Sequence, residues 1–324
     1  MSELALKLIR ENIEKHKRGE DANFLDLGNC GMTEVPEEIG ECVWVEELSI
    51  SSEWFDWEKE KWRKSINSGP KNIVSCISTG CTQLKNLKKL WLADHSTQES
   101  NFSDLSLISA FSELEYLDFA YSQIADLSPI SELLNLKQLN CSSTQITDLF
   151  LVKKLINLQN LNCADCEILD ISPISGLNKL RQLVIARTKV ADISALASLK
   201  HLEAIYLGGT PISDLSPLSE LKNVERLALW RTQIHDLSPL INFKKLYWLL
   251  LQESLVTDLS PLTKIKKLKV LSCDGLIISD WSYVSYCAGL ETLYANESNF
   301  CNLALLSRLI KLTRIEIKSC EISD

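Results

Sequence analysis

One phrase of 22 residues recurs through the last two thirds of this 324-residue chain. It first reads LEYLDFAYSQIADLSPISELLN from Leu114, and it returns nine times without a slip in spacing. The first apolar residue of each later copy lies at Leu136, Leu158, Leu180, Leu202, Val224, Leu246, Leu268, Leu290 and Leu312. A fixed short period is typical of a solenoid, in which each unit packs on its neighbours and the core grows along one axis. One elongated domain therefore accounts for the length.

The spacing of apolar residues within each unit identifies the kind of solenoid. The first, fourth and sixth places are apolar, as in Leu180, Leu183 and Ile185. This L-x-x-L-x-L pattern is that of leucine-rich repeats. Side chains of a strand alternate between its two sides, so the fourth and sixth residues both lie on the inward side of a short strand. We predict an α/β solenoid: a leucine-rich repeat horseshoe with a parallel β-sheet on the concave face and short 3₁₀ or helical turns on the convex face. About 13 repeats should fill residues 22–324.

Residues 1–21 have the pattern of an amphipathic helix. Leu4, Leu8, Ile9 and Ile13 recur at helical spacing, and Gly19 follows a basic last turn. The terminal repeat of a solenoid exposes its core unless something covers it. We therefore expect an N-terminal capping helix laid on the first repeat.

Two early repeats are longer than the rest. The repeat that starts at Val45 reaches Leu87 only after 42 residues, and the next takes 27 residues to reach Leu114. These excesses predict insertions near residues 51–72 and 93–101. Both fall between the strand and the next apolar anchor, so they should leave the same edge of neighbouring repeats and form one patch.

Two polar places recur in the repeats and suggest structural roles. The ninth place often carries threonine, as in Thr144, Thr188, Thr210 and Thr232, and we expect these hydroxyls to bond the loop backbone. The thirteenth place carries aspartate, usually followed two residues later by Ser-Pro, where serine could cap a helical turn and proline suits its first position. A row of aspartates could also bind calcium. Because each repeat offers only one carboxylate, at a turn that needs a hydrogen-bond acceptor, we expect the aspartates to accept hydrogen bonds within the turn instead. These aspartates are Asp126, Asp148, Asp170, Asp192, Asp214, Asp236, Asp258, Asp280 and Asp324.

Charge and the N-terminal segment restrict the partners and the compartment. The net charge is −9, which argues against nucleic acid and anionic membrane as ligands. The first residues carry charges throughout, unlike a signal peptide, and no apolar run approaches the ~20 residues of a membrane helix. The 11 cysteines are odd in number, and Cys141, Cys163 and Cys273 occupy an inward apolar place. We read them as buried thiols of a cytoplasmic protein.

Nothing in the chain has the pattern of a catalytic or metal site. Cys163 and Cys166 form a CxxC, but a closed zinc site needs four ligands and no second pair lies nearby. Phosphate-loop, HExxH, GxSxG and dinucleotide-binding motifs do not occur. An open curved sheet also offers little shelter from water. We expect neither enzyme activity nor a cofactor.

Large anchoring side chains gather on the predicted concave face. Counting the third, fifth, seventh and eighth places gives a polar region of small side chains, such as Gln138 and Asn160, followed by a richer one. Tyrosine, tryptophan and arginine dominate the energetics of many interfaces. The predicted partner-binding residues are Arg187, Tyr206, Arg226, Trp230, Arg231, Trp248, Leu250 and Tyr294. The alternative is that Trp230 and Trp248 merely cover each other.

A second group of aromatic residues surrounds the first insertion. It could form a secondary patch for a partner, or it could staple the insertion onto the first repeats. The residues concerned are Trp54, Phe55, Trp57 and Trp62 of the insertion, with Trp91, Tyr116 and Tyr121 on the adjacent concave face.

The regular units, with I-x-DLSPL after the strand, resemble the 22-residue repeats of internalins and of a phosphatase-regulating leucine-rich repeat subunit. The segments LALKLIRENIEKHKRGEDANFLDLGNCGMTEVPEEI and SSEWFDWEKEKWRKSINSGPKNIV are similar to the start of repeat regions in bacterial multidomain proteins. In that group the repeats are sensor arms attached to Roco-type GTPase, STAND-type NTPase, TIR or caspase-like domains. Unlike internalins, this chain has no export signal and many cysteines.

These features lead to one principal hypothesis and two alternatives. The principal one is a cytoplasmic protein-binding module, the ligand-sensing arm of a larger bacterial signalling or defence protein, with the ligand on its concave face. The chain stops at Asp324 in a repeat begun at Leu312, which suggests either a continuation or a covering subunit. The alternatives are a regulatory subunit of a separate enzyme such as a phosphatase, and a homodimer formed through the open C-terminal end.

Overall fold

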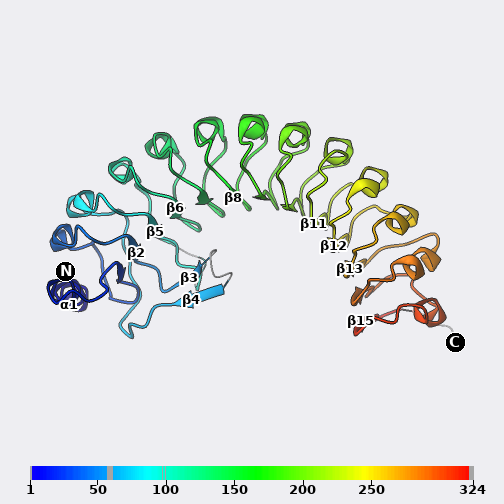
Figure 1. The fold of residues 1–324 in the computed structure, drawn as a ribbon, viewed down its shortest axis with the longest axis horizontal. Coiled ribbons are helices and arrows are strands. Elements are labelled where there is room, and N and C mark those ends of the chain that lie inside the picture. Colours follow the sequence, from blue (N-terminus) through cyan, green and yellow to red (C-terminus); the bar gives the residue numbers. More distant parts are fainter. Residues whose placement is uncertain (1, 57–60, 97, 99, 321–324) are drawn as a thin grey trace. The chain divides into compact units, whose positions relative to one another are not determined.

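The repeats form a solenoid whose chain divides into two compact units, Met1–Cys166 (unit 1) and Glu167–Asp324 (unit 2). The structure is a computed structural model that describes residues 2–320 except 57–60, 97 and 99. Within each unit the repeats place three-residue strands on one side and short 3₁₀ turns on the other (Figure 1). The predicted leucine-rich repeat architecture is confirmed.

The strands of each unit pair in parallel in the order of the sequence. Each pairing joins equal places of successive repeats, so that Tyr206 lies opposite Ala228 and Ala228 opposite Leu250. Among the described residues, unit 1 has β1 (Phe24–Asp26), β2 (Glu47–Ser49), β5 (Lys89–Trp91), β6 (Tyr116–Asp118), β7 (Gln138–Asn140) and β8 (Asn160–Asn162). Unit 2 has β9 (Gln182–Val184), β10 (Ala204–Tyr206), β11 (Arg226–Ala228), β12 (Trp248–Leu250), β13 (Val270–Ser272), β14 (Thr292–Tyr294) and β15 (Arg314–Glu316).

The core lies between the strands and the 3₁₀ turns. The middle strand residue points into it, as the complete burial of Leu183, Ile205 and Leu227 shows. Successive side chains of a strand point to opposite faces, so the residues on either side of this one point away from the core. We call that second face of the sheet the inner face. It is the surface on which neighbouring repeats present their variable side chains.

Most of the 3₁₀ turns begin two residues after the recurrent aspartate. Asp170 accepts hydrogen bonds from the backbone N–H of Ser172 at 2.7 Å and from its hydroxyl at 2.7 Å, and these two bonds hold the pKa of Asp170 below its usual value. The same pair of bonds recurs at Asp126, Asp214, Asp236 and Asp258. The prediction that serine caps the turn is wrong, because serine is the donor and aspartate the acceptor. Proline occupies an early turn position as predicted.

These 3₁₀ turns follow the same spacing as the strands. Unit 1 has η1 (Glu37–Glu41), η2 (Thr79–Gln83), η3 (Ile108–Ala110), η4 (Ser128–Ile130) and η5 (Phe150–Lys154). Unit 2 has η6 (Ser172–Gly176), η7 (Ser194–Ser198), η8 (Ser216–Leu218), η9 (Ser238–Asn242), η10 (Ser260–Lys264), η11 (Trp281–Tyr286) and η12 (Leu303–Leu306).

A second feature that recurs from repeat to repeat is the turn that follows each strand. The eighth place adopts a left-handed backbone, with φ of 55° at Ser143 and 55° at Arg187. The ninth-place hydroxyl then closes the turn: Thr188 donates to the carbonyl of Ile185 at 2.7 Å. Thr144, Thr210, Thr232 and Ser298 make the corresponding bond, which confirms the predicted role of these hydroxyls. The ladder is interrupted at Ser122 and Ser254, whose buried hydroxyls make no such bond.

The N-terminal helix α1 (Glu3–Lys17) covers the first repeat as predicted. Ser2 caps it by accepting from the Ala5 N–H at 3.2 Å. Ile9 is completely buried, and Asn12 bonds the Ala22 carbonyl at 3.0 Å and the Trp44 indole N–H at 3.0 Å. Apolar contact and two specific hydrogen bonds therefore fix the helix on the repeat.

The first insertion folds into an antiparallel hairpin, β3 (Glu53–Asp56) and β4 (Lys61–Lys64), which lies on the inner side of unit 1 (Figure 1). It contacts the second insertion, as expected from their equivalent places. Ser96 lies 2.9 Å from the Ser52 hydroxyl and accepts from Lys71 Nζ at 2.8 Å. The two insertions thus form one structure over the early repeats.

Candidate interaction surfaces

The hairpin is fixed to unit 1 by an aromatic cluster. Trp54 of β3 lies 5.8 Å from Trp91 of β5, ring centre to ring centre, and Trp91 lies 5.1 Å from Tyr116 of β6. Phe24 of β1 joins the cluster, 5.9 Å from Trp54. The Arg63 guanidinium covers it, 5.0 Å from Phe24 and 5.3 Å from Trp54. Three strands of the sheet and the hairpin therefore share one small core on the inner face.

This cluster decides what the secondary aromatic patch can do. Trp54, Trp91 and Tyr116 are only 1%, 2% and 5% exposed, so they are unavailable to a partner and act as the staple that the sequence allowed. Phe55 and Tyr121 are half-buried, whereas Trp62 is 54% exposed. Trp57 lies outside the described residues.

A buried polar pair lies beside the cluster. His95 of the second insertion bonds Asp118 of β6 at 2.8 Å, and Asp118 also accepts from the Tyr116 hydroxyl at 3.3 Å. The rings of Trp62 and Tyr121 each meet the His95 ring at 5.3 Å. Burial alone would lower the pKa of His95, but the Asp118 carboxylate outweighs burial and raises it. Sequence reasoning missed this pair, because His95 lies in the second insertion, where no other repeat has an equivalent residue.

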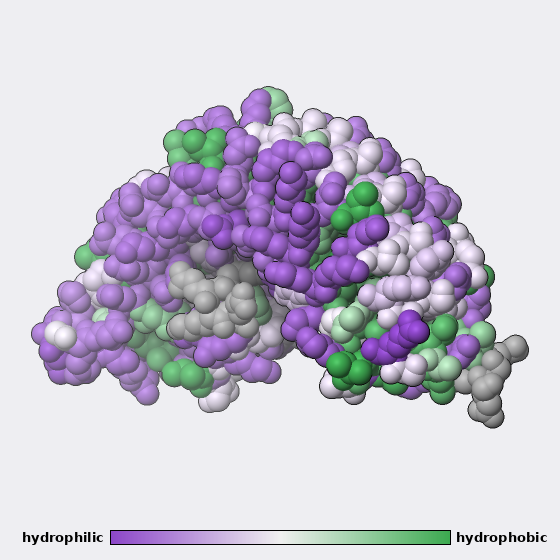
Figure 2. Space-filling model, turned by 45° about the vertical axis from the view of Figure 1, so that its right-hand side comes forward, coloured by the Kyte–Doolittle hydropathy of each residue, from purple (hydrophilic) through white to green (hydrophobic). Residues whose placement is uncertain are grey.

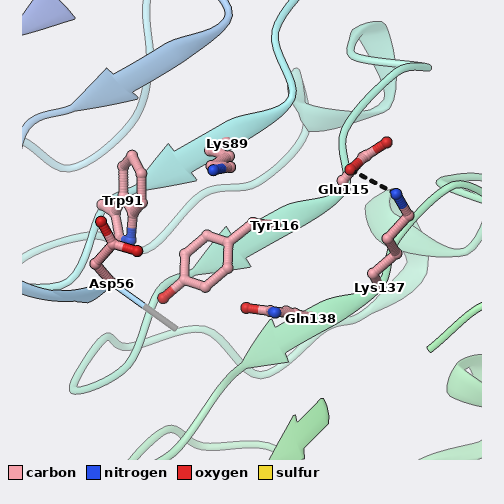
Figure 3. A pocket seen from close by; sticks show the side chains of 7 residues that line it. All are labelled: Asp56, Lys89, Trp91, Glu115, Tyr116, Lys137 and Gln138. Carbon is pink, nitrogen blue, oxygen red and sulfur yellow. Dashed lines mark ion pairs between the residues drawn. The ribbon is translucent and has the colours of Figure 1, made fainter. Parts of the chain in front are cut away.

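A small cavity opens next to the cluster between the hairpin and strands β5 to β7. Asp56, Trp91, Tyr116 and Gln138 line it, together with Lys89 and the ion pair of Glu115 with Lys137 at 2.7 Å (Figure 3). Its volume is about 40 Å³. Ligand pockets usually measure several hundred Å³, whereas a single water needs only about 10–15 Å³. The cavity has room for water and not for a substrate.

The inner face of unit 2 carries the aromatic residues predicted from the sequence. Tyr206 of β10 and Trp248 of β12 lie two strands apart, yet their ring centres are 5.9 Å from each other in an edge-to-face contact. On β11 between them, Ala228 lies opposite Tyr206 and Arg226 lies opposite Trp248, so the two rings meet diagonally across this strand. Ala228 is only 1% exposed. Tyr206 and Trp248 remain half-buried, and so do Arg226 and Leu250 beside them.

Trp230 is held differently, at the turn after β11. A Cβ atom built on Gly208, the equivalent place one repeat earlier, would lie 2.1 Å from the Trp230 ring. The ring therefore lies directly on the Gly208 backbone, with Arg187 at 5.7 Å from its centre. Tyr206, and not Trp230, is the aromatic partner of Trp248 within the described contacts. The alternative in which Trp230 and Trp248 cover each other does not describe the arrangement.

The remaining predicted residues lie around this centre. Arg231 has a left-handed backbone and pairs with Glu253 at 2.7 Å. Tyr294 lies on β14, separated from Leu250 by Ser272 of β13, and Arg314 covers its ring at 5.2 Å. On the side of the molecule drawn in Figure 2, hydrophobic side chains form separate patches divided by hydrophilic ones. The structure thus brings Arg187, Tyr206, Arg226, Trp230, Trp248 and Leu250 together and leaves Tyr294 apart.

A larger pocket lies at the edge of unit 2 where the strands begin. It has a volume of about 470 Å³. Five lysines line it, together with two glutamates, a tyrosine and a glycine: Lys245, Lys266, Lys267, Lys269, Lys311, Glu225, Glu291, Tyr247 and Gly289. Sequence reasoning missed it, although these residues flank the first apolar place of each repeat and could have been found by counting.

Most of the cysteines are buried. Eight of the 11 cysteines are buried, and all are free thiols. Burial raises the pKa of Cys163 well above its usual value and that of Cys287 to about 11, so both thiols stay protonated and unreactive. Within the part of the chain that the structure describes, no three histidine, cysteine or acidic side chains are placed to hold a metal ion.

Comparisons with known proteins agree with this fold. Residues 112–153 and 156–198 match the family of leucine-rich repeats (2 copies). The structure is similar to an internalin (inlF) from Listeria monocytogenes, with a TM-score of 0.80, 20% identity, and coverage of 100% of this chain and 94% of that one. A leucine-rich repeat protein of Leptospira interrogans gives a TM-score of 0.69 at 18% identity, covering 96% and 93%.

A plant peptide hormone receptor, RGFR1, in complex with RGF2, gives a TM-score of 0.62 at 19% identity, covering 89% of this chain and 46% of that one. No curated protein sequence matches the chain. The chain has a leucine-rich repeat fold, and structural likeness at these identities extends to that fold alone. None of the described helices combines the length and the apolar character needed to cross a bilayer.

Proposed function

We propose that the chain is a protein-binding repeat module whose ligand lies on the inner face of unit 2. The observation that carries this proposal is the pair of Tyr206 and Trp248, whose rings contact each other across β11 and yet remain partly open to solvent. Side chains already ordered in the free protein lose little conformational entropy on binding. Large aromatic residues of this kind are the commonest anchors of protein interfaces.

The surrounding residues suit the same role. Arg226 and Leu250 flank the pair on β11 and β12, and Trp230 lies at the adjoining turn with Arg187 over it. An apolar centre with arginines at its margin is the usual composition of an interface. RGFR1, which shares the fold, was solved with RGF2 bound, and this supports a peptide or protein ligand here.

We further propose that the module is the recognition arm of a cytoplasmic bacterial signalling or defence protein. The resemblance of its N-terminal segments to repeat arms in such proteins supports this. In such an arm, ligand binding on the repeats controls an effector domain. Catalysis would then lie outside the residues 1–324.

The test is a pull-down from bacterial lysate with the intact chain, followed by titration of the retained protein in purified form. Trp248→Ala should weaken its binding by about 2 kcal/mol, or roughly 30-fold, as expected for a central aromatic anchor. Tyr286→Ala is a matched control, because Tyr286 is 55% exposed on turn η11, away from the inner face. Equal affinity of the Trp248→Ala variant and the intact chain would contradict the proposal.

A second candidate is association between copies of the chain through the last repeats of unit 2. Ile310 is 90% exposed, Leu303 47% and Ile315 37%, which leaves an unusual amount of apolar surface in one place. Light scattering at several concentrations tests it. A dimer that Ile310→Glu converts to monomer supports association, whereas a monomer at every concentration excludes it.

A further inference from the structure

The lysine-lined pocket of unit 2 is the most strongly charged surface that the proposed function does not use. Its five lysines face only two glutamates. Lys269 pairs with Glu291 at 2.9 Å, and Lys245 donates to the Asn223 side chain at 3.0 Å. Within the described residues, Lys266, Lys267 and Lys311 have no hydrogen bond or ion pair. Three of the five lysines that line this pocket thus have no described partner for their ammonium groups.

The whole of unit 2 is also more positively charged than unit 1. Unit 1 has 16 lysines and arginines against 26 aspartates and glutamates, whereas unit 2 has 18 against 17. The net negative charge of the chain therefore belongs to unit 1. In unit 2 the recurrent aspartates follow the strands, so they lie toward the opposite edge from the pocket.

The edge where the strands begin concentrates the positive charge of unit 2. The two residues before and the one after each first apolar place, from Leu180 to Leu312, include ten lysines and arginines against three glutamates. The same places between Val45 and Leu158 in unit 1 include three of each. Because the strands are parallel and in register, these side chains lie along one edge of the sheet. The pocket lies on this basic edge.

We propose that this pocket is a docking site for an acidic peptide segment of a protein, one that presents several carboxylates within a few residues. A volume of about 470 Å³ falls in the range of peptide side-chain and small-ligand pockets. Glu225 and Glu291 interrupt the lysines and would repel an unbroken run of phosphates, whereas separate carboxylates can pair with individual lysines. Tyr247 adds an apolar surface that a peptide can contact and a free ion does not need.

The pocket and the aromatic centre are separate sites. Tyr247 precedes Trp248 in β12, so one ligand could reach both, but the proposed docking site does not depend on the aromatic centre. Lysine ammonium groups are compact charges on flexible stems, and their attraction for carboxylates is screened by salt. Binding should therefore weaken steeply as ionic strength rises.

The experiment measures fluorescence anisotropy of a labelled glutamate-rich dodecapeptide with the intact chain at low salt. Lys266→Glu/Lys267→Glu should weaken binding at least about tenfold, because two attractive charges become repulsive. The matched control is Lys153→Glu/Lys154→Glu, which changes the net charge equally on turn η5 of unit 1. It should alter binding by less than about threefold. All four lysines are exposed, so neither variant should unfold.

Three results would overturn the proposal. Equal weakening by both variants would mean attraction to net charge alone, and unchanged binding in the pocket variant would mean that the peptide binds elsewhere. Tighter binding of an equally charged oligonucleotide or of anionic phospholipid vesicles would assign the edge to a different ligand. Trp248→Ala should leave peptide binding unchanged, so failure of the aromatic site and failure of the pocket can be distinguished.

Discussion

The two units use one repeat in opposite ways. In unit 1 an inserted hairpin covers the inner face and buries Trp54, Trp91 and Tyr116, whereas in unit 2 the equivalent face is open and Trp248 remains half-exposed. The cores of both units are alike, since the middle residue of every described strand of the repeats is leucine or isoleucine. A repeat core thus determines where a face lies, and the residues between the core positions determine whether that face supports the fold or remains available to a partner.

The largest expected difference between the units is the cost of losing a tryptophan. Trp54→Ala removes a buried anchor and should lower the free energy of unfolding by about 3–5 kcal/mol. Trp248→Ala removes a half-exposed ring and should cost less than about 1.5 kcal/mol. Urea denaturation followed by circular dichroism measures both. Similar losses for the two variants would mean that the open face is structural as well.

Gly208→Ala tests how rigidly the open face holds its residues. The added Cβ would overlap the Trp230 ring, and overpacking of this kind costs about 1–3 kcal/mol. In a Trp230→Ala background the same substitution should cost less than about 0.5 kcal/mol, because the overlap is gone. Gly176→Ala is the control, since nothing lies within 4 Å of its added Cβ. An undiminished cost in the Trp230→Ala background would place the strain elsewhere.

Raising the pH should weaken unit 1 through His95. In the folded chain the pKa of His95 is raised above its ordinary value of 6.5. Burial alone would lower this pKa, but the Asp118 carboxylate outweighs burial. The protonated pair therefore stabilises the fold fully below pH 6.5, and this contribution is lost as the pH rises through the folded pKa. Urea midpoints between about pH 6 and pH 9 should fall for the intact chain and fall less for His95→Gln. Parallel pH profiles would show that the pair contributes nothing.

The smallest effect concerns a feature that the units share. Ser143 has a φ of 55°, a conformation that disfavours side chains with a Cβ. Ser143→Gly should stabilise unit 1 by about 0.5 kcal/mol after the added flexibility of the unfolded chain is counted. Ala186→Gly, at a place without positive φ, should destabilise unit 2 instead. Thermal denaturation measures both signs, and destabilisation by Ser143→Gly would contradict the assignment of strain.

The structural features that recur in every repeat could be predicted from the sequence, whereas the features that occur only once could not. Ten copies of one spacing specified the strands, the 3₁₀ turns and the threonine ladder, because each copy repeats the same apolar and turn requirements. The insertion has no second copy for comparison, and the aromatic cluster joins Phe24, Trp54, Trp91 and Tyr116 across long sequence separations. Its role as staple or binding patch therefore depended on tertiary contacts that composition does not contain.

The candidate sites also depend on contacts between neighbouring repeats that could not be predicted from the pattern of a single repeat. Counting places put Tyr206 and Trp248 on the inner face, but that they meet depends on the small side chain of Ala228 between them. The fixed position of Trp230 depends on Gly208 at the same place one repeat earlier. A comparison of equal places between neighbours, and not only within a repeat, would have found both.

The dependence of Trp230 on Gly208 implies that the order of the repeats is part of the information they carry. Their cores are interchangeable, so recombination could delete, duplicate or exchange whole 22-residue units without disturbing the solenoid. Deleting residues 202–223 would set Trp230 above Ala186, whose Cβ occupies the space that the ring needs. Such a chain would be expected to fold, yet its recognition surface would be altered at a junction where no residue had been substituted. Rearrangement of units is thus a route by which proteins of this kind can acquire new specificity in a single genetic step.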